Sequence, residues 1–113
     1  MSEPDASSIL SITTTVPARE PGLALARAAL AARLAACAQV DEAPVTSVYR
    51  WQGQVCEEGE WRVTFKTTPA CEPALRALVA AQHPYELPQW LVSPVQASAA
   101  YADWVRAETA PGP

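Results

Sequence analysis

The apolar positions of this chain alternate between two periods, one typical of strands and one typical of helices. Residues 9–16 are rich in Ile, Thr and Val, which predicts a strand. Residues 21–35 repeat Leu and Ala at spacings of three and four, which predicts an amphipathic helix. The helical spacing returns in residues 72–82, an apolar strand pattern occupies residues 90–95, and residues 97–107 predict a short final helix.

The first arm of a central hairpin is predicted between these helices. A strand starts at residue 37, is interrupted by Pro44 and continues to Trp51. Proline has no backbone N–H for a ladder, so this interruption indicates an edge position or a bulge. Gly53 supplies the positive φ that a hairpin turn over residues 52–54 requires.

The returning arm changes character along its length. We expect it to be irregular at residues 56–60, because this segment is acidic and contains Gly59. Beyond it, the period of two places alternate side chains on opposite faces of the strand. The apolar face carries Trp61, Val63 and Phe65, and the polar face carries Arg62, Thr64 and Lys66.

The resulting order, β-α-β-β-α-β followed by a helix, predicts an α+β fold of the ferredoxin-like split βαβ type. Right-handed crossovers place both main helices on one face of an antiparallel sheet and leave the other face bare. The hairpin carries more ring surface than two helices can cover, on Tyr49, Trp51, Trp61 and Phe65. We therefore expect self-association, with a closed ring as one solution.

Length and charge narrow the possible functions. The chain has 113 residues, which predicts a single domain over residues 9–107 between loose tails at 1–8 and 108–113. Its net charge is −4 and Lys66 is its single lysine, which argues against nucleic acid and anionic membranes as partners. No apolar run is long enough to span a membrane, and no secretory signal is visible, so we expect a cytoplasmic protein.

The connector His83–Pro88 brings an imidazole, a phenol and a carboxylate together between two prolines. His83 and Cys37 are the candidate ligands for copper or zinc, because both metals prefer imidazole and thiolate. The structural alternative has His83 at a helix C-terminus and Cys37 as a small buried side chain on a strand. Taken one residue at a time, we favour the structural alternative.

A polar row on the returning strand is the second candidate site. Glu60 shares a strand face with Arg62 and Lys66, and clefts between subunits are common ligand sites. If copies associate, this row could line such a cleft together with Tyr85 and Glu86 of the connector, near Tyr49 and Trp51 of the hairpin. The alternatives are a salt bridge between subunits at Lys66 and, for the acidic hairpin arm, simple solvation.

Catalysis is not expected from these residues. The single histidine has no nucleophile partner in a recognisable motif, and four glycines provide no phosphate-binding loop. We therefore expect a binding protein rather than an enzyme.

A set of short segments between residues 9 and 106 resembles the CutA family of divalent-cation tolerance proteins. They occur in order and at the family's spacing: Leu34–Val40, Ser47–Val55, Glu60, Lys66-Thr67, His83–Pro88, Ser93–Val95 and Tyr101-x-x-Trp104. The resemblance implies a homotrimer of ferredoxin-like subunits, similar in architecture to P-II signalling proteins. It also implies a role in divalent-cation tolerance, with copper binding in some members.

The chain departs from the copper-binding members of that family. Those members use a cysteine where Thr14 stands and two successive histidines where Gln82 and His83 stand. A hydroxyl and an amide are poor copper ligands, so we expect weak or altered copper binding. The alternative is a P-II-like signalling or scaffolding trimer that binds a small ligand or a partner in its clefts between subunits.

Overall fold

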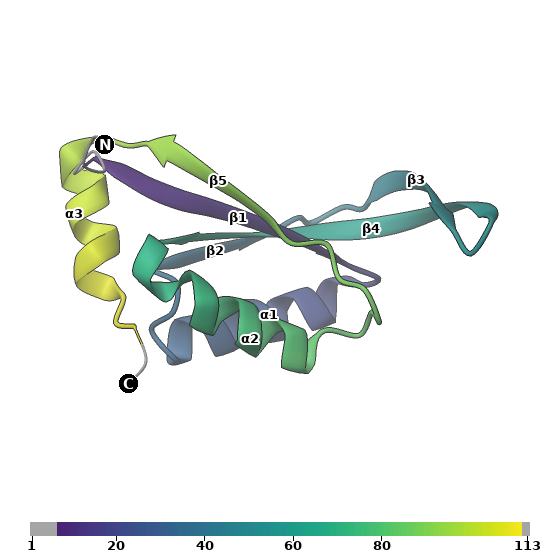
Figure 1. The fold of residues 1–113 in the computed structure, drawn as a ribbon, viewed down its shortest axis with the longest axis horizontal. Coiled ribbons are helices and arrows are strands. Elements are labelled where there is room, and N and C mark those ends of the chain that lie inside the picture. Colours follow the sequence, from purple (N-terminus) through teal and green to yellow (C-terminus); the bar gives the residue numbers. More distant parts are fainter. Residues whose placement is uncertain (1–6, 112–113) are drawn as a thin grey trace.

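A computed structural model describes residues 7–111, and the outer parts of both predicted tails lie outside the described residues. The elements follow the predicted order (Figure 1): β1 (Ser8–Val16), α1 (Arg19–Ala31), β2 (Cys37–Val40), β3 (Val45–Trp51), β4 (Gln54–Thr67), a 3-10 turn (Pro69–Cys71), α2 (Glu72–Gln82), β5 (Leu91–Gln96) and α3 (Ala99–Glu108). The boundaries shift slightly from the expected ones, and Ser8 and Glu108 belong to regular elements rather than to the tails.

The sheet is antiparallel throughout, with strand order β2-β4-β1-β5. β4 pairs with β2 through one part of its length and with β3 through the other, so β2 and β3 are two pieces of one edge. Pro44 lies in the gap between them, where the ladder is interrupted as predicted. The α+β prediction with an antiparallel sheet is confirmed.

Both main helices lie on the same side of the sheet, and α3 lies across one end (Figure 1). The main core forms between α1, α2 and the sheet, and includes Ile12, Leu25, Phe65 and Leu75, each at most 1% exposed. A smaller cluster, which includes Ile9 and Val105, joins α3 to the opposite face of the sheet. Away from α3, no helix of the described residues covers that second face.

The hairpin of β3 and β4 extends beyond the helices (Figure 1). Its turn places Gln52 and Gly53 at positive φ, 50° and 79°, as a two-residue hairpin loop requires. The expected irregularity at residues 56–60 is wrong, because Gly59 pairs regularly with Thr46. A Cβ at Gly59 would lie 3.4 Å from Pro44 Cβ, which is an ordinary van der Waals distance, so Pro44 packs beside this strand without requiring a glycine there.

Candidate functional site

The connector between α2 and β5 is fixed at its start by His83. The backbone N–H of His83 donates to Val79 O and closes the last turn of α2. Its Nδ1 accepts the backbone N–H of Tyr85 at 3.1 Å, which places the ring proton on Nε2. Nε2 lies 2.9 Å from the carbonyl of Thr15 and 3.1 Å from Thr14 Oγ1. Both ring nitrogens are therefore engaged, and His83 joins the connector to the end of β1.

Burial lowers the pKa of His83 below its usual value, against smaller opposing effects from its Thr15 hydrogen bond and from Glu60. The neutral ring is the form that accepts the Tyr85 N–H, so protonation would break that bond. The same bonds leave neither nitrogen lone pair open to a metal.

A pH dependence of stability follows from this shift. The folded pKa lies below the unfolded value of about 6.5, so the unfolded chain takes up the proton first as the pH falls. His83 therefore stabilises the fold above that pH, and we expect this contribution to be lost as the pH falls from 6.5 toward the folded pKa. Thermal unfolding between pH 7.5 and 5.5 tests this, with His83→Gln as the non-titrating variant. Equal slopes for both proteins would contradict it.

The rest of the connector is held by two further contacts. Tyr85 donates its hydroxyl hydrogen to Glu60 Oε2 at 2.9 Å, which ties the connector to β4. Trp90 donates its indole N–H to Glu72 Oε2 at 3.1 Å, and its ring centroid lies 6.4 Å from that of Phe65. A segment without regular secondary structure is thus anchored at three points to the core.

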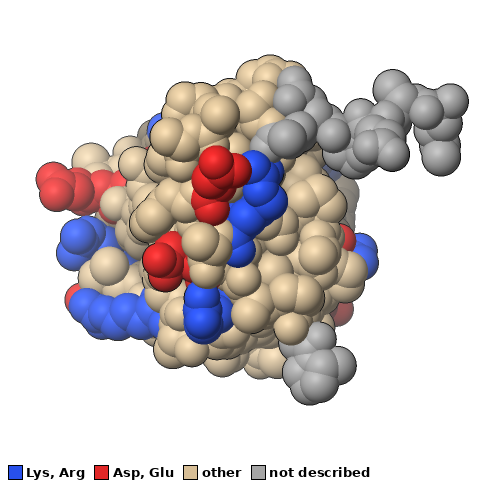
Figure 2. Space-filling view, turned by 90° about the vertical axis from the view of Figure 1, so that its left-hand side faces the viewer, with Lys and Arg blue, Asp and Glu red and all other residues tan. Residues whose placement is uncertain are grey.

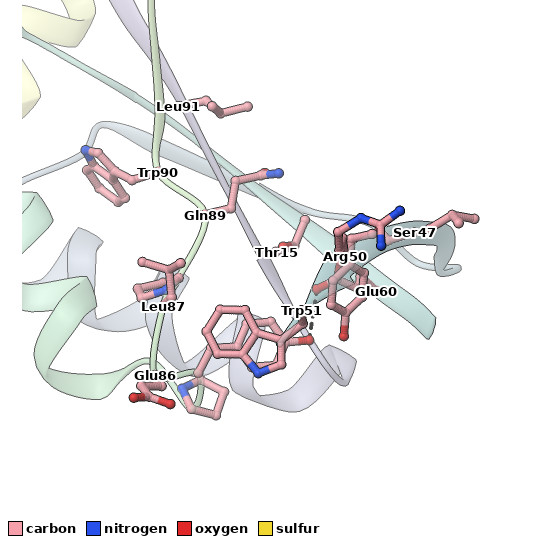
Figure 3. Close-up of a pocket in the computed structure, with 15 residues that line it drawn as sticks. Thr15, Ser47, Arg50, Trp51, Glu60, Glu86, Leu87, Gln89, Trp90 and Leu91 are labelled. Carbon is pink, nitrogen blue, oxygen red and sulfur yellow. Dashed lines mark hydrogen bonds between the residues drawn. The ribbon is translucent and has the colours of Figure 1, made fainter. Parts of the chain in front are cut away.

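A cleft of about 880 Å³ opens between this connector and the hairpin, and we call it the hairpin cleft. Its lining comes from β1, from β3 and β4, and from the connector with the start of β5: Thr15, Ser47–Trp51, Glu60 and Pro84–Leu91. Figure 3 shows Trp51 reaching from the hairpin toward the connector, while Arg50 is directed away from it. Five predicted residues meet here: Tyr49, Trp51, Glu60, Tyr85 and Glu86.

The two tyrosines of the hairpin cleft lie in acidic surroundings. The Glu58 carboxylate beside Tyr49 is the main cause that raises the pKa of Tyr49 to about 12. Burial, followed by the hydrogen bond to Glu60, raises the pKa of Tyr85 well above its usual value. The charges of Glu60, Glu58 and Tyr49 raise the pKa of Tyr85 further.

The two basic residues of the predicted row lie elsewhere. Arg62 forms an ion pair with Asp41 at 2.9 Å, and Lys66 donates to Gln39 Oε1 at 2.9 Å. Both partners come from β2 or from the residue that follows it. Strand alternation correctly places Glu60, Arg62 and Lys66 on one face. Of the three, only Glu60, which is nearest the hairpin turn, lines the cleft.

The two candidate metal ligands are not brought together. Cys37 pairs with Lys66 on β4, whereas His83 binds the end of β1 at Thr14 and Thr15. Cys37 instead lies near α3, where burial and then Cys37 raise the pKa of Tyr101. Within residues 7–111, no three His, Cys, Asp or Glu side chains are grouped closely enough to hold a metal ion.

Several cleft residues were missed by sequence reasoning. Ser47, Gln89 and Leu91 line the hairpin cleft, yet none was a candidate. Ser47 lies in a segment that carries the family resemblance, which was the available signal. Gln89 and Leu91 gave none, because their position depends on how the connector packs.

Two further observations concern the charge of the surface and the hydropathy of the helices. At the end of the molecule seen in Figure 2, uncharged surface predominates and basic groups lie beside acidic ones rather than forming a stripe. No helix in the described part of the chain is long and apolar enough to cross a membrane.

Comparison with known proteins identifies the family. The family model described as "CutA1 divalent ion tolerance protein" matches residues 10–108. A divalent-cation tolerance protein CutA from Thermus thermophilus is 38% identical over 99 residues, which cover 87% of this chain and 95% of that protein. The solved structure of CutA from Synechococcus elongatus is 39% identical with a TM-score of 0.85, and the match covers 92% of each chain. This chain therefore belongs to the CutA1 divalent ion tolerance protein family.

Proposed function

We propose that this protein acts in divalent-cation tolerance as a homotrimer that binds a small ligand in the hairpin cleft, without catalysing a reaction. The observation that supports the proposal is the cleft itself, which lies between an anchored connector and a projecting hairpin. Its volume of about 880 Å³ falls in the range of small-molecule sites, and aromatic side chains with a few polar groups line it.

Self-association is supported by the apolar surface that one copy leaves exposed. On the hairpin, Val48 and Val55 are 61% and 63% exposed, and Trp51 is 39% exposed. On the uncovered face of the sheet, Leu91 of β5, which lies opposite Thr13, is also exposed. The radius of gyration of 14.9 Å exceeds the roughly 13 Å expected for a compact domain of this length, because the hairpin projects. Neighbouring copies provide a natural cover for such a hairpin. Because Val48, Trp51 and Leu91 also line the hairpin cleft, a neighbouring copy would form one wall of the cleft.

A role in binding rather than catalysis is supported by the state of His83. A general base needs an open nitrogen within reach of the proton that it removes. Both nitrogens of His83 are used to hold the connector, and the one hydroxyl among their partners, that of Thr14, belongs to a fully buried residue.

Copper or zinc binding at His83 and Cys37 is the alternative form of the cation-tolerance role. The separation of the two side chains and the engaged imidazole predict weak binding at most. We expect calorimetric titrations with copper and zinc to give small heats that are the same for wild type and His83→Ala. A heat that disappears in His83→Ala would show instead that the imidazole leaves its bonds to bind the metal.

A ligand panel with a blocking variant tests the proposed cleft. Thermal unfolding would be followed in the presence of nucleotides, carboxylic acids, sugars, amines and ammonium compounds. We expect one class to raise the midpoint of wild type and to have no effect on Ser47→Tyr, whose ring would occupy the cleft from β3. Thr46→Tyr is the matched control, because Thr46 is the neighbouring residue on the opposite face of the strand and is not part of the lining.

Two results would contradict the proposed function. One is the absence of any stabilising compound in the whole panel. The other is a ligand whose effect persists unchanged in Ser47→Tyr, since such a ligand binds elsewhere.

A further inference from the structure

We propose that the hairpin cleft is selective for a small organic cation, a ligand that carries an ammonium group. This inference rests on the proposed function and names the chemical class of its ligand. It follows from the identity of the side chains on the cleft side of the hairpin, from the burial of Glu60 and from the rings around it.

The hairpin register decides which side chains share that face. Residues directly opposite each other in an antiparallel pair point to the same side. The pairs Val45–Glu60, Ser47–Glu58 and Tyr49–Cys56 therefore share one face, which also carries Trp51 opposite Gln54. The pairs Val48–Glu57 and Arg50–Val55 occupy the other face. The face with Tyr49 and Trp51 thus carries Glu58 and Glu60, whereas Arg50, which also lines the hairpin cleft, lies on the other face and is directed away from the connector in Figure 3.

Glu60 is a buried carboxylate without a cationic partner among residues 7–111. It is 9% exposed and lines the hairpin cleft. Its Oε2 accepts the Tyr85 hydroxyl, and its other oxygen accepts no hydrogen bond from residues 7–111. The ion pairs among the same residues join Arg62, Arg76 and Arg106 to Asp41, Glu72 and Asp103, and include neither Glu58 nor Glu60. A buried carboxylate is costly unless a positive charge and hydrogen-bond donors meet it, and a small organic cation with a hydroxyl or N–H group supplies both.

Aromatic faces determine which kind of cation fits best. Tyr49, Trp51 and Tyr85 all line the hairpin cleft. Tyr85 donates its hydroxyl hydrogen to Glu60 Oε2 at 2.9 Å, and Glu58 lies on the same hairpin face as Tyr49. Aromatic rings attract weakly hydrated organic cations through their negative faces, whereas divalent metal ions prefer six to eight oxygen ligands. Three rings with two carboxylates therefore favour an ammonium ligand over a metal ion.

Choline and its neutral analogue 3,3-dimethyl-1-butanol provide the test, because they share their shape and differ in charge. Binding to the full chain would be measured by calorimetry and by the fluorescence of the cleft tryptophans. We expect choline to bind about tenfold or more tightly than the neutral alcohol, as one cation–π contact with a paired carboxylate provides. Calcium chloride at the same ionic strength is expected not to displace choline.

Three substitutions locate the effect. Glu60→Gln retains an oxygen that accepts the Tyr85 hydroxyl and removes the charge, and we expect choline binding to weaken about tenfold or more. Glu57→Gln makes the same change on the opposite face of the hairpin and is expected to leave binding unaltered. Tyr49→Leu, which removes a ring but no charge, is expected to weaken choline binding several-fold.

Equal binding of choline and the neutral alcohol would overturn the inference, as would equal losses in Glu57→Gln and Glu60→Gln. So would displacement of choline by calcium, or failure of choline to bind at all. If choline fails while an anion or a sugar stabilises wild type but not Ser47→Tyr, the proposed function survives and the ligand class is wrong. If no compound acts at the cleft, both fail.

Discussion

Replacing Phe65 with alanine is expected to lower the free energy of unfolding by about 3–5 kcal/mol. The Phe65 side chain is fully buried in the main core. It lies on the central strand β4, directly opposite Ile12 on one side and Ala38 on the other, with Trp90 packed nearby. Removing the ring leaves a cavity that these neighbours cannot fill, because they belong to a paired sheet and an anchored connector. Chemical denaturation at a fixed protein concentration measures the loss.

Phe65→Leu separates the cavity from a change in hydrophobicity. Leucine fills most of the space, so we expect it to cost less than half as much as alanine. A loss below about 1 kcal/mol for Phe65→Ala would show that the ring is not central to the core.

Replacing Trp51 with alanine is expected to shift the protein from a trimer toward smaller species at micromolar concentration. Tryptophans at the centre of interfaces commonly contribute about 2 kcal/mol or more, which is a change of about thirtyfold in each association constant. Trp51 lies near the tip of the projecting hairpin, beyond the helices of its own chain. Light scattering coupled to size-exclusion chromatography measures the mass of the variant.

Leu30→Ala is the matched control for Trp51→Ala. Leu30 is 38% exposed, nearly the same as Trp51, but belongs to α1 in the helix layer, which the proposed trimer leaves facing solvent. We expect its mass to equal that of wild type. An unchanged mass for Trp51→Ala, or an equal loss in both variants, would place the interface elsewhere.

The fold could be predicted from the sequence because its local signals agree with one another. The strand pattern of residues 9–16, the helix stripes and the Gly53 turn each specify an element, and their order leaves few topologies. The irregular strand predicted around Gly59 failed because pairing along the whole hairpin outweighs the local signal. Gly59 pairs in register with Thr46, and its neighbours Glu58 and Glu60 pair with Ser47 and Val45.

The candidate site was less predictable, because strand alternation specifies a face but not a neighbourhood. Glu60 and Lys66 share a face of β4 in the sequence pattern, yet one reaches the hairpin cleft and the other bonds to Gln39. His83 was visible as the only histidine, but its partners at Thr14 and Thr15 come from β1, 68 or more residues away along the chain. The sequence therefore identified these residues, whereas the contacts that define their roles are visible only in the folded structure.

Sedimentation equilibrium of wild type at micromolar concentration tests the central claim most directly. The hairpin and the uncovered sheet face expose apolar side chains that a second and a third copy are proposed to cover. We predict a single species with three times the chain mass of 12.1 kDa. A well-folded species with the mass of one chain would contradict the proposed assembly.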